Sequence, residues 1–282
     1  MPWRPRPSDR FYRVIVRTGL ALRRLFRIRV IVTGREHLPV PEPLGEAPRG
    51  RSRRVVPGRG AVVAITHFGY LDFAFAELLL WRHAKAQLRF LVTQAAADHW
   101  FAGPAVSAAG HFAVGYDSGS HAYDAAVARL RAGEYIAILP EAGVSRSFRV
   151  RECKTGAVRM AAEAGVPVIP VSVWGAHRLM TRGHGFSPAR AWRAPVRIHV
   201  GEPLTVDPAR DAGQATEELR LALQAGIDAS IADFPLAPSP GVWWMPADLG
   251  GGAPTDGERQ RMDEAEGPRR AGGRRNRLPD AN

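Results

Sequence analysis

Apolar residues in the central part of the chain form short runs that alternate with amphipathic segments. Short apolar runs flanked by turn residues predict strands at 61–65, 88–92, 111–116, 135–139, 166–173 and 196–200. Apolar residues at helical spacing predict helices at 73–83, 120–132, 154–164 and 215–234. Because strands alternate with helices, we expect a single α/β domain with a mostly parallel central sheet flanked by helices.

Proline and glycine modify two of these predictions. The run 166–173 contains Pro167 and Pro170, and proline cannot donate a hydrogen bond to a neighbouring strand. We therefore expect a bend in this strand, or a place at an edge of the sheet. Residues 95–109 are rich in alanine but contain Gly103-Pro104, which predicts a broken helix.

The segment before the first strong strand is basic and amphipathic. Apolar residues recur at roughly helical spacing over residues 9–31, and six arginines lie among them between Arg13 and Arg29. A clean membrane span needs roughly 18 or more apolar residues, so this segment does not fit one. We expect an amphipathic helix in the membrane interface, and the alternative is a helix packed on the domain. Residues 29–32 are a candidate first strand, and residues 40–60 predict a surface loop.

Charge is concentrated at the same end of the chain. The formal net charge is +12, and residues 1–59 hold 15 arginines against four carboxylates, a net of +11. Such a segment predicts contact with an anionic surface. Aliphatic residues between the arginines favour lipid, because single-stranded nucleic-acid binders add aromatic residues on which bases stack. We therefore expect membrane lipids and no nucleic acid as partners.

Cysteine content and the N-terminus bear on the compartment. Cys153 is the one cysteine, which excludes an internal disulfide and a multi-cysteine metal cluster and suits a reducing compartment. No signal peptide is recognisable. We expect a peripheral protein on the cytoplasmic face of the membrane.

The C-terminal part has a different composition. Residues 236–282 are rich in Pro, Gly, Asp and Arg, with Trp243-Trp244-Met245 as an apolar exception. We expect a low-complexity, disordered tail there. The predicted organisation is a basic interfacial helix and loop at 1–59, a catalytic domain at 60–235 and the tail at 236–282.

A histidine and a carboxylate lie at the predicted turn between strand 61–65 and helix 73–83. His67 could take a proton from a hydroxyl, and Asp72, five positions later, could fix the imidazole tautomer. No Gly-x-Ser-x-Gly nucleophile motif is present, so the pair would serve direct transfer to a bound hydroxyl. The alternative is that His67 caps a helix or packs in a core.

A second polar block follows the strand 135–139. Pro140-Glu141 opens into the loop 142–151, which carries Ser145, Arg146, Ser147, Arg149 and Arg151. Backbone N–H groups and guanidinium groups in such a loop can bind a phosphate. Glu141 would hydrogen-bond an acceptor hydroxyl or hold an arginine, and the alternative is an ordinary solvated basic loop. We expect no metal site, because no helical pair of histidines is present.

Taken together, these blocks resemble the glycerolipid acyltransferases of the 1-acylglycerol-3-phosphate acyltransferase (PlsC-like) type. The His-x4-Asp motif of that family is matched by His67 and Asp72. Its Pro-Glu-Gly block with a trailing Arg-Ser is matched by Pro140, Glu141, Gly143, Arg146 and Ser147. A Val-Pro-x-x-Pro-Val block is matched by residues 166–171, and the resemblance covers roughly residues 60–200.

The resemblance implies a reaction and roles for these residues. His67 would be the general base and Asp72 its orienting partner. The acceptor, a lysophospholipid or glycerol phosphate, would be bound by Glu141, Gly143, Arg146 and Ser147. Pro170 would shape the donor site, and the donor would be an acyl-CoA or acyl-carrier-protein thioester, with no further cofactor. The expected activity is O-acyl transfer in phospholipid biosynthesis, from 1-acylglycerol-3-phosphate to phosphatidic acid.

Two departures from the family pattern concern the acceptor. Tyr116 stands where the family has an arginine, so one phosphate contact is either missing or supplied by His111, Arg149, Arg151 or Lys154. The loop from Glu141 to Arg146 spans five positions, where the common form spans three. The alternatives are a different lipid or polyol acceptor, hydrolysis of the thioester, or a non-catalytic protein that binds anionic lipid.

Overall fold

A computed structural model describes residues 9–38, 59–93, 107–114 and 119–275. The chain divides into two compact units. The first is built from the chain up to Val144 and from Val150 to Pro235, and the second from Ser145–Arg149 and the chain after Pro235. Most of the expected broken helix at 95–109, and also Tyr116, lie outside the described residues.

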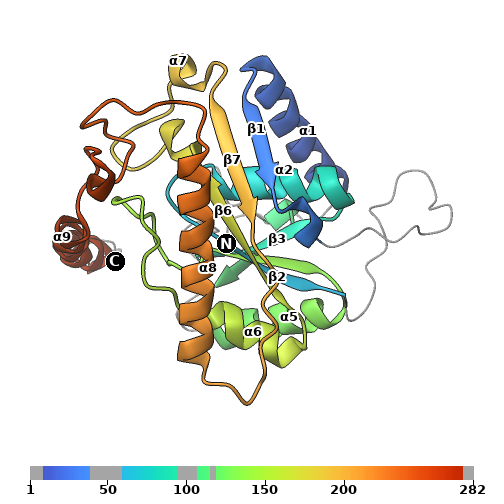
Figure 1. The fold of residues 1–282 in the computed structure, drawn as a ribbon. Helices are drawn as coiled ribbons and strands as arrows, with labels where there is room; N and C mark the ends of the chain where they lie inside the picture. The colour runs from blue at the N-terminus through green and yellow to red at the C-terminus, as the bar shows by residue number, and fades with distance from the viewer. Residues whose placement is uncertain (1–8, 39–58, 94–106, 115–118, 276–282) are drawn as a thin grey trace, which may run out of the picture. The chain divides into compact units, whose positions relative to one another are not determined.

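A seven-stranded sheet forms the centre of the first unit, in the order β1-β7-β6-β2-β5-β3-β4. The strands are β1 (Arg29–Thr33), β2 (Ala61–Ile65), β3 (Leu88–Thr93), β4 (Phe112–Val114), β5 (Tyr135–Ile138), β6 (Val168–Trp174) and β7 (Pro195–Val200). Neighbouring strands are parallel except β6 and β7, which are antiparallel. The predicted α/β fold with a mostly parallel sheet is therefore confirmed (Figure 1). The sheet also takes in β1, which lies before the predicted start of the domain at residue 60.

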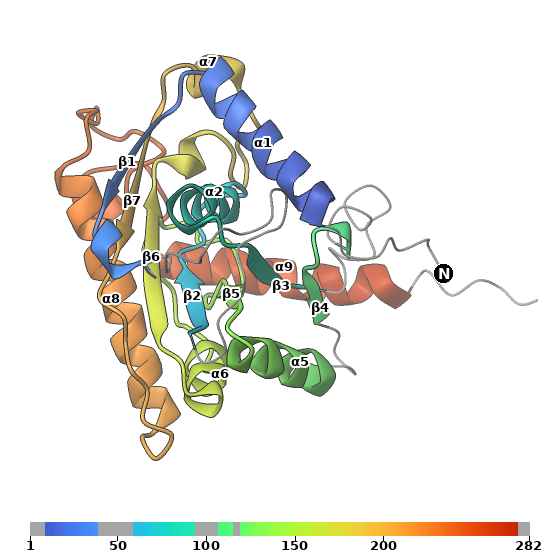
Figure 2. The same ribbon diagram turned by 90° about the vertical axis from the view of Figure 1, so that its right-hand side faces the viewer.

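Helices cover both faces of this sheet. They are α1 (Asp9–Leu25), α2 (Asp72–Ala84), α5 (Gly119–Arg131), α6 (Gly156–Ala164), α7 (Pro188–Ala191) and α8 (Ala212–Ala232), with short 3-10 helices η1 (Arg35–His37) and η2 (Ala176–Arg178). Figures 1 and 2 show α2 and α8 on opposite faces, and α8 packs on β6 and β7 while α2 packs on β2, β3 and β6. Because helices cover both faces, every residue of β2 and β6 is buried.

The place of β6 in the sheet corrects one prediction. Its prolines suggested a bend or a place at an edge of the sheet. The edge alternative is wrong, because β6 lies in the interior between β7 and β2. Pro170 is tolerated because the antiparallel ladder with β7 ends at the pair Val171–Val200, next to it. Gly201 then gives the proline ring room, since a Cβ at that glycine would lie 2.8 Å from the Pro170 Cγ.

The basic helix α1 packs on the domain with one side. Tyr12 and Val16 are buried and have Leu78 and Trp81 as neighbours, and the Tyr12 hydroxyl accepts the Leu88 N–H at 3.0 Å. On this side α1 is therefore a helix packed on the domain, which was the alternative to a helix in the membrane interface. Other apolar side chains of α1 are exposed, namely Phe11, Val14, Leu22 and Leu25. Among the described helices, none is long and apolar enough to cross a membrane.

The second unit contains more structure than its composition predicts. It includes η3 (Ala247–Leu249) and α9 (Asp256–Arg275), so the expected disorder of the tail is corrected over residues 236–275. The physical reason lies in the apolar exception noted in the sequence. Trp244 and Met245 are buried, and the Trp243 ring packs edge-on against Phe148 with centroids 6.4 Å apart.

Candidate active site

His67 lies in the turn that joins β2 to α2. β2 ends at Ile65, α2 begins at Asp72, and the His67 side chain between them is half-buried. The Asp72 carboxylate reaches back over the turn, and its Oδ2 accepts the N–H groups of Phe68 at 2.6 Å and Gly69 at 2.7 Å. These N–H groups lie just before the helix and have no partner within it. One buried carboxylate therefore fixes the backbone that carries His67.

A second segment closes over the same turn. The Thr181 hydroxyl donates to the Phe68 carbonyl at 2.5 Å, and the Tyr70 N–H donates to the Met180 carbonyl at 3.1 Å. Gly69 permits this approach, because a Cβ there would lie 2.7 Å from the His177 Cα. The loop after β6 therefore supports the turn after β2, its parallel neighbour.

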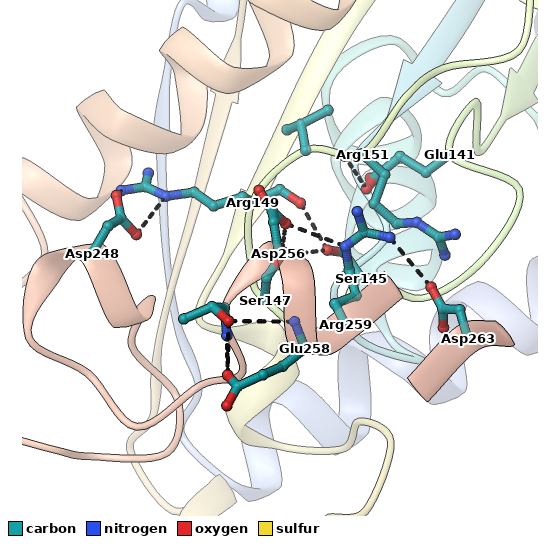
Figure 3. Close-up of polar contacts among 12 residues, drawn as sticks. Glu141, Ser145, Ser147, Arg149, Arg151, Asp248, Asp256, Glu258, Arg259 and Asp263 are labelled. Carbon is teal, nitrogen blue, oxygen red and sulfur yellow. Dashed lines mark hydrogen bonds and ion pairs between the residues drawn. The ribbon is translucent and has the colours of Figure 1, made fainter. Parts of the chain in front are cut away.

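Glu141 connects the His67 turn to the loop that precedes α6. The carboxylate is buried, and its Oε1 accepts the His67 N–H at 2.7 Å. Its Oε2 accepts the Arg151 N–H at 3.0 Å (Figure 3). Hydrogen bonds to a carboxylate are stronger than those between neutral groups. Glu141 thus holds Arg151 through the backbone of that residue and sets the position of two segments that are far apart in sequence.

The surroundings of His67 favour its neutral form. The pKa of its imidazole is lowered to about 4, mainly by burial; a hydrogen bond with the Gly69 backbone opposes this shift, and the nearby charges of Arg182 and Arg151 add to it. At neutral pH the ring is therefore uncharged and able to accept a proton. Its Nδ1 is buried and has no hydrogen-bond partner.

Asp72 has opposing influences on its charge. Burial raises the pKa of its carboxyl well above the usual value, the hydrogen bonds from Gly69 and Phe68 lower it, and the Glu141 carboxylate raises it. Its Oδ1 is buried without a hydrogen-bond partner. The two atoms that an orienting hydrogen bond would join, Nδ1 of His67 and Oδ1 of Asp72, are thus both buried and unsatisfied, whereas Oδ2 serves the backbone.

Three other predicted residues lie in the first unit near these elements. Gly143 lies beside the Arg151 guanidinium, because a Cβ at that glycine would lie 3.0 Å from Nη1. Lys154 is exposed and donates its N–H to the Pro140 carbonyl at 2.9 Å. Pro170, in contrast, is buried within β6 opposite Ala64, before the strand reaches the edge where His67 lies.

His111 is not brought to the His67 turn. It precedes β4, which is three positions from β2 in the order β2-β5-β3-β4, or about 14 Å at the usual strand spacing. Its Nδ1 accepts the Phe90 N–H at 3.1 Å, and its ring packs edge-on against Phe90. Burial lowers the pKa of His111 to about 4, so it does not offer a positive charge to a phosphate at neutral pH.

Arg146, Ser147 and Arg149 belong to the second unit. There the Ser147 hydroxyl donates to Asp256 Oδ1 at 2.8 Å, and the Arg149 guanidinium forms an ion pair with Asp248 (Figure 3). Two side chains that the sequence suggested for the acceptor are thus engaged by carboxylates of the C-terminal segment.

Sequence reasoning missed Arg182, whose charge lowers the pKa of His67. The signal for it was topological. β2 and β6 are parallel neighbours, so the segments that follow their carboxyl ends meet at one edge of the sheet. The polar turn Thr181-Arg182-Gly183-His184 follows β6 as the His67 turn follows β2. Without the strand order, nothing in the sequence indicated that these two turns are adjacent.

Comparison with known proteins identifies the group to which this architecture belongs. One solved structure that matches is that of the 1-acyl-sn-glycerophosphate (LPA) acyltransferase, PlsC, from Thermotoga maritima, with a TM-score of 0.58. The sequences are 19% identical over 80% of this chain and 81% of that chain, so this likeness shows the fold. Comparison with curated proteins gives no match. The model of the Acyltransferase family matches residues 29–174, from β1 to the end of β6 and more than half of the chain, and this chain therefore belongs to the Acyltransferase family.

Proposed function

We propose that this acyltransferase moves a fatty acyl group from an acyl-CoA or acyl-carrier-protein thioester to the hydroxyl of a lysophospholipid or glycerol phosphate. 1-Acylglycerol-3-phosphate is the acceptor and phosphatidic acid the product. The single observation that carries the proposal is a neutral, half-buried His67 held by two buried carboxylates beside the charges of two arginines.

In the proposed reaction His67 acts as the general base. The acceptor oxygen attacks the thioester carbonyl carbon while the imidazole takes the hydroxyl proton. The new C–O ester bond forms, the C–S bond breaks, and the proton passes from the imidazolium to the leaving thiolate. A single base can carry out this sequence, so no acyl-enzyme intermediate is needed.

Asp72 is proposed to orient the imidazole. A hydrogen bond from Nδ1–H of His67 to Oδ1 of Asp72 would satisfy both of these buried atoms. An ionised Asp72 would then stabilise the imidazolium that forms during the transfer. The Oδ2 atom can keep its two backbone hydrogen bonds throughout.

The charges around His67 favour a phosphorylated acceptor. Arg151 and Arg182 both lower the pKa of His67, so positive charge lies near the proposed base. Guanidinium groups are well suited to bind phosphate oxygens. With Tyr116 in the place of the family arginine, we assign the acceptor phosphate to Arg151 and Arg182, with Lys154 at the margin. A peripheral position at the membrane, with the exposed apolar residues of α1 in the interface, would bring lipid acceptors to this site.

The test is transfer of a radiolabelled acyl group from acyl-CoA to lysophosphatidic acid, glycerol 3-phosphate and neutral lysolipids. We expect phosphatidic acid as the main product and a loss of about 10²–10⁴-fold in kcat for His67→Ala. His184→Ala is the matched control, because it removes a half-buried histidine from the neighbouring turn. Unchanged activity of His67→Ala would contradict the mechanism. Free fatty acid as the only product would indicate a thioesterase, and vesicle binding without turnover would indicate a non-catalytic lipid-binding protein.

A further inference from the structure

A cavity of about 220 Å³ lies between α1, β1, η1 and α2. Its lining combines apolar side chains of α1, β1 and α2 with Arg23, Arg35, Arg82 and His83. No carboxylate is among them. The cavity therefore combines apolar carbon with three guanidinium groups, a combination typical of a site for an anionic amphiphile.

The positive charges of the arginines at this cavity are not balanced by carboxylates. Burial lowers the pKa of Arg23, and the charges of Arg82 and Arg24 lower it further. Arg23 Nη1 donates to the Ile28 carbonyl at 3.3 Å, but its Nε is buried without a partner. Within the described residues, no ion pair involves Arg23, Arg35 or Arg82. An anion bound between these three arginines would relieve the repulsion among their charges.

The helix dipole explains why two of these arginines are favourable where they lie, but it does not explain the third. Arg23 lies in the last turn of α1 and Arg82 in the last turn of α2, where a cation is favoured by the helix dipole. Arg35 lies in η1 and reaches the same cavity from a different element. Three different elements thus contribute arginines to the lining of one cavity.

We propose that this cavity, the α1–α2 pocket, binds the phosphodiester headgroup of an anionic membrane phospholipid. The headgroup lies between the arginines, and the glycerol carbons contact Val30, Val32 and Phe75. The cavity is smaller than the ~300–1,000 Å³ of sites that enclose a drug-sized ligand, so it takes a headgroup and not the acyl chains.

The apolar part of the lining favours a lipid over a free phosphate. Leu20, Val30, Val32 and Phe75 would contact the glycerol carbons of a lipid headgroup, whereas inorganic phosphate would leave these side chains against water.

The α1–α2 pocket is distinct from the proposed active site. Arg82 and His83 lie at the last turn of α2, whereas Asp72 begins the same helix, a distance of about 15 Å along the axis. The inference deepens the membrane association contained in the proposed function, but it does not depend on acyl transfer. It assigns a resident, non-reacting lipid that would fix the orientation of α1 on the membrane.

The experiment compares two pairs of substitutions in the full chain. Arg35→Gln with Arg82→Gln removes two exposed charges from the pocket, and neither side chain makes a hydrogen bond among the contacts described above. Arg17→Gln with Arg24→Gln is the matched control, which removes two exposed charges from α1 outside the pocket. Binding to vesicles of phosphatidylglycerol and phosphatidylcholine is measured by co-sedimentation without acyl donor. A salt concentration of about 0.5 M screens diffuse attraction.

We expect the pocket pair to weaken binding to phosphatidylglycerol vesicles by about tenfold or more and the control pair by about twofold or less. Equal losses in the two pairs would overturn the proposal, because they would show that only overall charge matters. Equal binding of the unmodified chain to pure phosphatidylcholine vesicles would also overturn it.

Two further measurements separate the sources of the anion and the two proposals. Glycerol 3-phosphate is added as a competitor, and we expect it not to release the protein from the vesicles; release at low concentration would overturn the assignment to a lipid.

Acyl transfer to a water-soluble acceptor is measured in parallel. The pocket pair should leave this activity within about twofold of the unmodified chain, whereas His67→Ala should abolish it and keep vesicle binding. A failure of one proposal is thus distinguished from a failure of the other.

Discussion

The His67 turn and the Ser145–Arg149 loop are both polar, but they are held by different kinds of bonds. At the turn, the buried carboxylates of Asp72 and Glu141 accept four backbone N–H groups. In the loop, side chains bond to carboxylates such as that of Asp248, which is 61% exposed. An unsatisfied buried donor costs ~1–3 kcal/mol, whereas an exposed ion pair contributes ~0–1 kcal/mol. The turn should therefore respond strongly to substitution and the loop weakly.

Asp72 should give the largest effect, because its two oxygens have different roles. Asp72→Asn keeps an oxygen for the Phe68 and Gly69 N–H groups but replaces the other oxygen with an NH2 group, which cannot accept the imidazole N–H. We expect a fall of roughly 10²–10⁴-fold in kcat with a small change in stability. Asp72→Ala also removes the acceptor and should lower the free energy of unfolding by about 2–4 kcal/mol. Steady-state kinetics and urea unfolding measure the two effects; equal stability of both variants would show that Oδ2 does not hold the turn.

Glu141 should have an intermediate effect. In Glu141→Gln one of the two carboxylate oxygens becomes an NH2 group, which cannot accept a hydrogen bond, so either His67 or Arg151 loses its partner. We expect a loss of about 1–3 kcal/mol in the free energy of unfolding and a fall in kcat of roughly 10–100-fold, since small displacements of a base are costly. Glu152→Gln, at an exposed position near Arg151, is the control. A variant with normal kcat would show that the carboxylate does not position His67.

The pH dependence should report the environment of His67. Its pKa is about 4 instead of 6.5, so the acid limb of kcat/KM should lie near pH 4. A bound phosphate would offset the charges of Arg151 and Arg182, so the limb in kcat should lie at a higher pH. The unfolded chain binds a proton near pH 6.5 and the folded chain only near 4, so stability should decrease as the pH falls between these values. A limb at pH 6.5 in kcat/KM would contradict the buried, neutral state.

Removing the two contacts of the Ser145–Arg149 loop with Asp248 and Asp256 should give the smallest effect. Asp248→Asn with Asp256→Asn removes the charges that engage Arg149 and Ser147. An ion pair with an exposed carboxylate such as Asp248 should contribute at most about 1 kcal/mol, and an amide oxygen at position 256 can still accept the Ser147 hydroxyl. Glu202→Gln is an exposed control. Thermal unfolding measures the change. A KM for the acceptor that falls in the double variant would show that these carboxylates compete with the acceptor phosphate, and a loss of several kcal/mol would reverse the comparison.

The sequence predicted the elements of the first unit well, because buried strands and helices leave periodic patterns. It also predicted two polar blocks after β2 and β5, and these lie together because the two strands are neighbours and Glu141 accepts the His67 N–H. Pro170 misled the prediction because tolerance of proline depended on Gly201, a partner 31 positions away. Arg182 and the C-terminal segment were missed for a similar reason. Their positions depend on strand order and on aromatic packing by Trp243 and Trp244, which local composition does not reveal.

The close approach at Gly69 has a consequence for engineering this protein. Since even a methyl group would meet the backbone of the loop after β6, position 69 is closed to variation in any library that seeks a new acceptor preference. Arg182 and Lys154 offer better positions, because each side chain reaches solvent at the same end of the sheet. Altered selectivity should therefore be sought by varying the side chains around the turn while its backbone is left unchanged.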